Sequence, residues 1–265
     1  MNCFNMIDTG YLQLAKNQAL NFGMPHMQNH TLHLVCMDEV SYVSMQTFIQ
    51  VKQVENVKLT HVPISKFGGR ELSYGDSGFR ELMRLRPRIF MQMAKELGGA
   101  LHTEADVFWF QDPENLVKDA GDFDWLMQHD ASGPDYHVAW LNIGCTYYSS
   151  TPGSMKMFEL WIKHHDSSSL MDQEALCELL QTTVDPAFRL FPILEEGFDF
   201  RDATQKLNVS IKCFDKRLVQ NGHCAFKEGY INLHSPAAIH VNHHSGVGKK
   251  IELLKSCGAW IYGGD

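Results

Sequence analysis

Two carboxylates, one residue apart, lie within an otherwise apolar part of the chain. Residues 98–113 read GGALHTEADVFWFQDP, in which Glu104 and Asp106 fall between Leu101 and the apolar run 107–110. A buried carboxylate is costly unless a cation or hydrogen-bond donors meet it. If the backbone turns at the end of a strand here, both groups can face one Mg²⁺ or Mn²⁺ ion, which takes oxygen ligands. The pattern therefore indicates a divalent-metal site, against the simpler alternative of one loop-capping and one solvated carboxylate.

A second set of residues capable of such chemistry lies at 237–250, which reads AAIHVNHHSGVGKK. A short strand is predicted to end at His240, and His243, a glycine-rich turn, Lys249 and Lys250 follow. An imidazole beside carboxylates suits Mn²⁺ better than Mg²⁺. Glycine N–H groups beside a lysine suit a phosphate. The alternatives are a surface turn with solvated lysines, and a zinc hydrolase site with HxxHH spacing that lacks the HExxH pattern.

Two further polar groups have ordinary structural explanations as well. Asp172 and Gln173 begin a predicted helix, where an aspartate also serves as a cap and favours the helix dipole. Arg86 lies in RLRPRIF shortly before the acidic segment, and arginine suits bidentate phosphate contacts, although helix-surface arginines are usually solvated. Asp112, which precedes Pro113, is predicted to start the turn that leaves the acidic segment.

Strands and helices alternate over the first two-thirds of the chain, which predicts an α/β fold with a mostly parallel sheet covered on both faces. Ligands bind beyond the carboxyl ends of the strands in such sheets. Asp38, Glu104 and Asp106 fall at such ends and are expected to converge. The predicted strands are 3–8, 30–38, 57–64, 101–110, 123–130 and 138–150. The predicted helices are 11–22, 41–54, 78–99 (a pair or a kinked helix, broken near Pro87), 152–166, 169–184 and, as a short helix or loop, 247–260, with a turn-rich segment over 185–242.

The length, composition and net charge of the chain limit the class of protein to which it can belong. With 265 residues and 44% hydrophobic content, the chain is expected to form one domain. A net charge of −8 without a basic block argues against nucleic acid and anionic membranes as partners. Seven scattered cysteines without a CxxC argue against a disulfide framework and favour a reducing compartment. No signal peptide or membrane span is recognised, so we expect a soluble, cytoplasmic protein without an integral membrane segment.

Taken together, four segments resemble the nucleotide-diphospho-sugar transferase family, GT-A glycosyltransferases with a DxD motif. They are similar above all to the plant α-xylosyltransferase and arabinosyltransferase group. The segments occur in the family's order as TEADVFWFQDP, LNIGCTYY, MDQEALCELL and HVNHHSGVGKKIELLKSCGAW. The likeness spans residues 8–260. The small, anchorless form resembles soluble members from bacteria or large algal viruses.

The resemblance implies a single GT-A domain over 1–265, with a nucleotide-binding half at 1–113 and a sugar and acceptor half at 114–265. It implies a glycosyltransferase that uses Mn²⁺ or Mg²⁺ to move a sugar from a UDP-sugar, with xylose or galactose suggested, to a glycan or glycoprotein acceptor. It favours retention of anomeric configuration, although the residues leave inversion open. The alternatives are a nucleotide-sugar or carbohydrate-binding protein on an inactive scaffold, and a metal hydrolase.

The resemblance also implies roles for individual residues. Asp106 would bind the metal, Glu104 would replace the family's first aspartate near the metal or ribose, and His240 would be the third ligand, with His243 as its competitor. The remaining implied contacts are Gly246 with Lys249 or Lys250 for the diphosphate, Thr9, Gly10, Tyr11 and Asp38 for the nucleoside, Arg86 for the phosphates, Asn142 and Gly144 for the sugar pocket, and Asp172 and Gln173 for the donor sugar.

Overall fold

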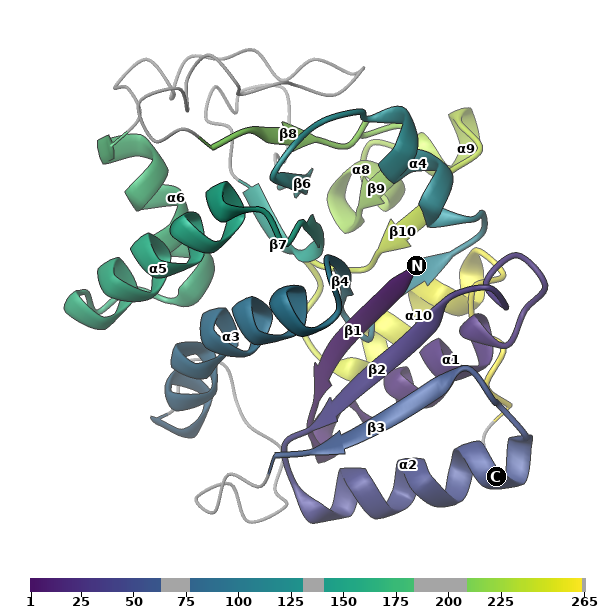
Figure 1. Cartoon of the computed structure of the whole chain (residues 1–265). Coiled ribbons are helices and arrows are strands. Elements are labelled where there is room, and N and C mark those ends of the chain that lie inside the picture. The colour runs from purple at the N-terminus through teal and green to yellow at the C-terminus, as the bar shows by residue number, and fades with distance from the viewer. Residues whose placement is uncertain (63–76, 131–140, 184–208, 264–265) are drawn as a thin grey trace.

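A seven-stranded sheet forms the centre of the protein (Figure 1), whose computed structural model describes residues 1–62, 77–130, 141–183 and 209–263. Its strands are β1 (Asn2–Ile7), β2 (Thr31–Cys36), β3 (Val57–His61), β4 (Ala100–Thr103), β6 (Trp125–His129), β7 (Leu141–Tyr148) and β8 (Ile211–Cys213). They lie side by side in the order β3-β2-β1-β4-β7-β6-β8. The neighbouring pairs are parallel except those of β7, which is antiparallel to both β4 and β6. The predicted mostly parallel sheet is thus confirmed.

Helices cover both faces of this sheet, as predicted (Figure 1). One face carries α1 (Leu12–Phe22) and α2 (Glu39–Lys52), and the other carries α3 (Ser77–Glu96), α5 (Pro152–Ser167) and α6 (Asp172–Thr183). Successive strand residues point to opposite faces, so Cys3 of β1 packs into the first core and Phe4 into the second. This alternation explains why short apolar strands with few exposed residues serve two hydrophobic cores.

Of the two alternatives predicted for residues 78–99, the helix pair is not found, because α3 is one helix that continues through Pro87. A proline inside a helix removes one backbone hydrogen bond and crowds the preceding turn. Leu82 and Phe90, on either side of Pro87, are both buried in the second core, and this packing holds the two halves in one element. The helix is followed by Gly98 and Gly99, as predicted, with φ angles of +69° and +104° that favour glycine.

The sequence predicts one strand over residues 101–110, but the structure has two strands there, and they belong to different sheets. Beyond β4 the chain turns at Glu104–Asp106 and enters β5 (Val107–Trp109), which pairs with β10 (Ala238–His240), itself paired with β9 (Val219–Asn221). In the antiparallel β5–β10 register, His240 lies opposite Val107. The second sheet therefore brings a C-terminal histidine next to the acidic turn.

Short helices complete the described chain. They are η1 (Thr9–Tyr11), α4 (Pro113–Asp119), α8 (Gly222–Phe226), α9 (Tyr230–Leu233) and α10 (Val247–Ser256). The segment expected to be a short helix or loop at 247–260 is therefore a helix over most of its length. Parts of the predicted strands at 57–64 and 138–150, and much of the turn-rich segment, lie outside the described residues.

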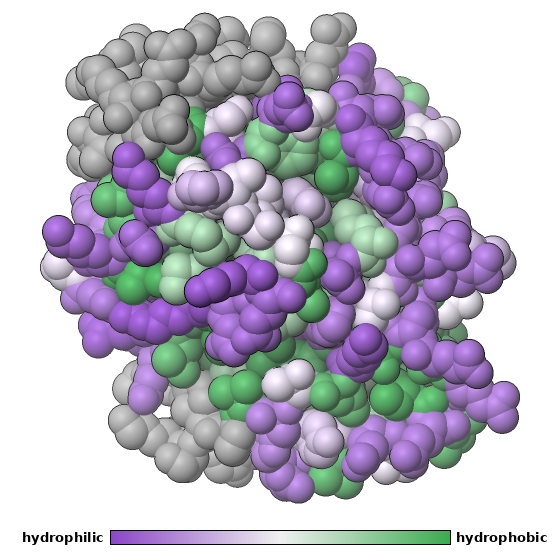
Figure 2. Space-filling view, viewed as in Figure 1, coloured by the Kyte–Doolittle hydropathy of each residue, from purple (hydrophilic) through white to green (hydrophobic). Residues whose placement is uncertain are grey.

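The surface is largely hydrophilic on the face seen in Figure 2, with apolar side chains gathered in small groups between the polar ones. Several exposed large hydrophobic side chains of the described chain lie on α2, namely Val40, Val43 and Val51. Among the described helices, none combines the length and apolar character that crossing a membrane requires.

Candidate active site

Buried amides fix the backbone of the acidic turn. The Gln18 side chain of α1 donates from Nε2 to the carbonyl oxygens of Thr103 and Glu104, at 2.9 and 2.8 Å. Asn5 of β1 in turn donates to Gln18 Oε1 at 3.0 Å. Both amides are about fully buried, with exposures of 1%. Neither residue was predicted as functional, because nothing in the sequence pairs them with a turn that lies more than eighty residues away.

Glu104, Asp106 and His240 form a compact cluster of metal-ligand atoms. One such atom from each residue lies within 4.8 Å of the others. His240 Nε2 lies 3.2 Å from Glu104 Oε2 and 3.3 Å from Asp106 Oδ1. On the other side of the ring, Nδ1 lies 2.7 Å from Gln128 Oε1, and since an amide oxygen only accepts, this contact directs Nε2 at the carboxylates. The predicted pair of carboxylates and His240 are therefore brought together.

Gly144 of β7 provides the space behind this cluster. A Cβ atom added to Gly144 would lie 2.4 Å from His240 Cε1 and 2.7 Å from Glu104 Oε2. Such distances are far shorter than van der Waals contact, so one of the two side chains would have to move. The glycine of LNIGC thus stands against the ligand cluster itself.

We expect Gly144→Ala to lower Mn²⁺ affinity by roughly 10–100-fold, the range seen when groups that orient metal ligands are changed. The added methyl group displaces His240 or Glu104 while the buried β7 backbone stays paired. Binding isotherms for Mn²⁺ measure the effect. Gly248→Ala is the control, since a Cβ there meets nothing within 4 Å. Equal affinities in both variants and the wild type would contradict the geometry.

Two basic side chains neutralise the acidic turn. Lys250 Nζ of α10 lies 2.6 Å from Asp106 Oδ2 and 5.6 Å from the centre of the Tyr11 ring. Arg86 of α3 contacts Glu104 Oε1 at 2.5 Å and Asp172 Oδ2 at 3.1 Å. Arg86 therefore joins the acidic turn to the start of α6, where the sequence predicts the sugar contacts.

The two lysines that the sequence left as alternatives have different surroundings. Lys250 reaches Asp106, and its side chain is 13% exposed. Lys249 is 55% exposed and pairs with Glu252 at 3.1 Å on the same helix. Gly246 precedes α10 with a φ of +83°, a conformation that favours glycine and allows the chain to enter the helix here. Lys250 is therefore the better candidate for a diphosphate contact.

These contacts change the protonation of the cluster. Burial alone would raise the pKa of Asp106, but the Lys250 ammonium and the His240 ring outweigh it and hold that pKa well below its ordinary value. Burial would lower the pKa of His240, but Asp106 and Glu104 raise it to about 9. His240 is therefore a cation at neutral pH in the ligand-free protein.

The raised pKa of His240 predicts a pH-dependent stability. The folded pKa of about 9 exceeds the ordinary 6.5, so the contribution is complete below pH 6.5 and is lost as the pH rises through 9. We expect the gap in unfolding free energy between wild type and His240→Gln to narrow by up to about 3 kcal/mol across that window. Urea unfolding in chelator-containing buffers measures the gap at each pH. A gap that stays constant, or widens, would show that His240 is not protonated as described.

Asp130, directly after β6, organises the neighbouring polar side chains. Its Oδ1 accepts hydrogen bonds from Asn142 Nδ2 at 3.1 Å and Asn242 Nδ2 at 2.8 Å, and it lies 3.0 Å from His243 Nε2. Its Oδ2 accepts from Gln173 Nε2 at 2.8 Å. His243 is therefore paired with Asp130 and lies outside the cluster formed by His240.

Asp130 was not predicted, although it carries the same signal as Asp38. Each is an aspartate that follows an apolar strand, LMQHD in one case and LVCMD in the other. Gln128, which contacts His240, carries the signal of a polar residue inside a buried strand. Both signals are common in sheets, and only the fold shows which of them belong to a site.

Asp38 holds the predicted nucleoside segment in place. Its two carboxylate oxygens accept hydrogen bonds from the backbone N–H and the hydroxyl of Thr9, at 2.8 and 2.6 Å, and from the N–H of Ser41 at 2.8 Å. Asp38 is thus the N-cap of α2 and a clamp on η1, which contains Thr9, Gly10 and Tyr11. Although Asp38 holds η1 in place, the Tyr11 side chain remains 37% exposed.

A cavity of about 210 Å³ lies beside the acidic turn. Its wall includes Asp8, which follows β1, Tyr11 from η1, Arg86 from α3, and Glu104. The rest of the lining is mostly apolar, with methionines among it. The cavity therefore adjoins both the predicted nucleoside segment and the ligand cluster.

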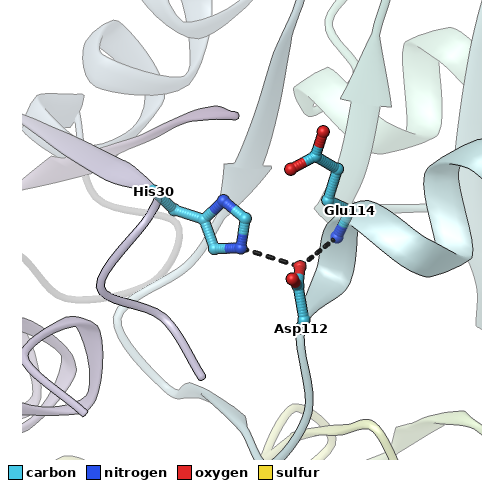
Figure 3. A group of neighbouring side chains, drawn as sticks. All are labelled: His30, Asp112 and Glu114. Carbon is cyan, nitrogen blue, oxygen red and sulfur yellow. Dashed lines mark hydrogen bonds and ion pairs between the residues drawn. The ribbon is translucent and has the colours of Figure 1, made fainter. Parts of the chain in front are cut away.

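A second group of ligand-type side chains, His30, Asp112 and Glu114, has a structural explanation (Figure 3). Asp112 is the N-cap of α4 and accepts from the Glu114 N–H at 2.8 Å, as its predicted turn role implies. His30 Nε2 lies 2.8 Å from the same carboxylate oxygen, and His30 Nδ1 lies 3.2 Å from the Met1 nitrogen. Both ring nitrogens are thus engaged within the protein, and the group anchors the start of α4.

Residues 27–254 match the family described as nucleotide-diphospho-sugar transferase. The chain belongs to this family. Among curated relatives, this transferase is similar to the β-arabinofuranosyltransferase RAY1 of Arabidopsis thaliana, with 23% identity over 205 residues. The match covers 71% of this chain and 35% of the relative, so the chain spans about a third of that protein's length.

Solved structures show the fold of this transferase. The galactosyltransferase LgtC, in complex with donor and acceptor sugar analogues, superimposes with a TM-score of 0.53 at 12% identity and covers 98% of this chain and 96% of its own. Mouse xyloside xylosyltransferase 1 gives a TM-score of 0.52 at 10% identity, with 92% and 98% covered. These likenesses confirm the predicted GT-A fold.

The transferase fold brings most of the predicted site residues to one region. The residues linked to one another through the contacts above are Asp106, Glu104, His240, Gly144, Lys250, Tyr11, Arg86 and Asp172. Asn142 and Gln173 adjoin this group through Asp130. His243 contacts Asp130 rather than the carboxylates of the cluster. Thr9 and Asp38 are hydrogen-bonded to each other, and Lys249 pairs with Glu252 rather than with Asp106.

Proposed function

We propose that this protein transfers a sugar from a UDP-sugar to a glycan or glycoprotein acceptor with the help of a divalent cation. The observation that carries the proposal is the Glu104–Asp106–His240 cluster, which lies beside a cavity at the carboxyl end of β1. Family membership supports a nucleotide-sugar donor. The expected nucleotide half, 1–113, and sugar half, 114–265, are part of the same proposal, and each contributes residues to the cluster.

The ligand atoms that the cluster offers suit Mn²⁺. Two carboxylates and one imidazole are ligands that Mn²⁺ accepts, and Mg²⁺ accepts the carboxylates. His240 would release its proton when the cation binds, because only a neutral imidazole can ligate a metal. Asp106 and His240 have exposures of 1%, whereas the Glu104 side chain is 31% exposed. A cation held there would neutralise negative charge on a leaving diphosphate.

Lys250 would share that neutralisation. Breaking a glycosyl–phosphate bond places negative charge on the diphosphate, and cationic groups already in position stabilise the transition state. Lys250 Nζ, 2.6 Å from Asp106, is within reach of any phosphate that approaches this carboxylate. Lysine acts on phosphate as a flexible point charge.

Asp172 and Gln173 would serve the sugar side. Burial raises the pKa of Asp172, while Arg86 opposes the rise. The Asp172 carboxylate would stabilise the positive charge that develops at the anomeric carbon, or it would orient the sugar. Gln173 accepts from the Ile143 N–H at 3.3 Å and donates to Asp130, so its side chain is fixed beside β7. Arg86 would keep Asp172 and the acidic turn at a fixed separation.

A donor panel tests the proposal. Purified protein is incubated with Mn²⁺ or Mg²⁺ and with UDP-xylose, UDP-galactose or UDP-arabinofuranose, and UDP release is measured with and without candidate glycans. We expect release with one donor, stimulated by an acceptor. UDP binding without release would favour a binding protein on a transferase scaffold. Zinc in the purified protein, with hydrolysis that needs no nucleotide sugar, would favour a hydrolase.

A further inference from the structure

The carboxylates of the acidic turn are already paired within the protein. Lys250 Nζ contacts one oxygen of Asp106 at 2.6 Å, and His240 Nε2 approaches the other at 3.3 Å. Arg86 contacts one oxygen of Glu104 at 2.5 Å, and His240 lies 3.2 Å from the other. Asp106 is 1% exposed, so its charge depends on these partners rather than on water. A ligand that uses these oxygens therefore competes with a side chain of the protein.

Lys250 is the partner that such a ligand would displace. A divalent cation at Asp106 would lie close to the Lys250 ammonium, and like charges repel strongly where water is scarce. The Lys250 side chain is long and 13% exposed, so it can leave Asp106 without a change in the α10 backbone. An ammonium that is displaced from Asp106 loses its ion-pair partner, and the diphosphate of the donor supplies another anion for it.

We propose that Lys250 makes the binding of the divalent cation and of the nucleoside diphosphate depend on each other. Lys250 holds Asp106 in the ligand-free protein and weakens binding of the cation alone. It moves to the diphosphate when both ligands are present. Since coupling is reciprocal, each ligand then raises the affinity for the other by the same factor. This inference rests on the proposed function, because it takes the diphosphate to be the second ligand.

Lys249 offers a matched control one residue away. It carries the same charge on the same helix, but it is 55% exposed and pairs with Glu252. Removing its charge alters the general field near the site without touching Asp106. A difference between the two lysine variants therefore reports the Lys250–Asp106 contact itself.

Mn²⁺ binding followed by electron paramagnetic resonance of the free ion tests the inference, alone and with saturating UDP. For Lys250→Gln we expect Mn²⁺ alone to bind about five- to tenfold more tightly than in wild type, in the range of ordinary coupling. With UDP present, we expect the same variant to bind Mn²⁺ no more tightly than wild type, so the coupling factor falls. Lys249→Gln should match wild type in both titrations, and Lys250→Arg should retain weak binding of Mn²⁺ alone.

The opposite results would overturn the inference. If Mn²⁺ alone binds Lys250→Gln with unchanged or lower affinity, Lys250 does not compete with the cation, although UDP binding can still need its charge. If wild-type protein binds neither UDP nor Mn²⁺ in any combination, the proposed function itself fails. Circular dichroism of each variant, with Lys250→Met as a second neutral replacement, separates loss of contact from loss of fold.

Discussion

Replacing Asp106 with asparagine is expected to reduce sugar transfer and donor hydrolysis by at least about 10²–10³-fold, the size of the loss when one group that stabilises transition-state charge is removed. Asparagine keeps the shape of the side chain but not the charge that would hold the cation. UDP release with Mn²⁺ and the preferred donor measures the loss. Lys250, whose side chain is partly exposed, can turn towards water, so the variant should remain folded.

Glu114→Gln is the matched control for this experiment. Glu114 belongs to the other group of ligand-type side chains, with His30 and Asp112, and its side chain is 35% exposed. If that group only anchors α4, the control keeps wild-type activity. Full activity in Asp106→Asn, or loss of activity in Glu114→Gln alone, would mean that the wrong cluster has been assigned to the reaction.

Arg86→Met is expected to cost both stability and activity. Arg86 contacts Glu104 and Asp172, and the Asp172 side chain is 5% exposed. Removing one partner from a buried pair leaves an uncompensated charge, which costs about 3–5 kcal/mol. Chemical denaturation measures the loss, and UDP release should fall with it because the acidic turn and the start of α6 are no longer joined.

Arg88→Met, on the same helix, provides the comparison. Arg88 pairs with Asp166 at the surface, where the two side chains are 41% and 47% exposed. Exposed pairs contribute about 0–1 kcal/mol, so this variant should remain close to wild type. If both variants lost similar amounts of unfolding free energy, the loss would come from changing α3 itself rather than from breaking the buried contacts of Arg86. The double variant Arg86→Met/Asp172→Asn should recover part of the stability, since it also removes the unpaired carboxylate.

The sequence was sufficient for the order of strands and helices from β1 to β4, because alternating apolar segments carry that information locally, but it did not predict α4, α8 or α9. It did not show that the acidic segment divides between two sheets, since both parts are buried strands and no local pattern shows which strand each one pairs with. It also could not separate Lys249 from Lys250, because adjacent helix residues differ by about 100° in direction and only the packing of α10 shows which one faces Asp106.

The polar residues that support the cluster were harder to predict than its ligands. Gln128 and Asp130 reach His240 and His243 across more than a hundred residues, so no local pattern connects them. His243 has a φ of +60°, an uncommon backbone conformation for a residue other than glycine, and this bend separates its direction from that of His240. The HxxHH spacing alone gave no reason to prefer one histidine.

The position of the acidic turn between two sheets has a consequence for folding. Glu104 and Asp106 are anchored by β1, α1 and β4, but His240, the third member of the cluster, arrives on β10, more than a hundred residues later. Contacts between distant segments form late, because closing a long loop costs entropy. A partly folded chain can thus complete its central sheet before β10 docks and still lack the cluster. If the cluster binds a cation as proposed, a chain in which β10 has not yet docked would offer only two of the three ligands, so tight cation binding would report completed folding.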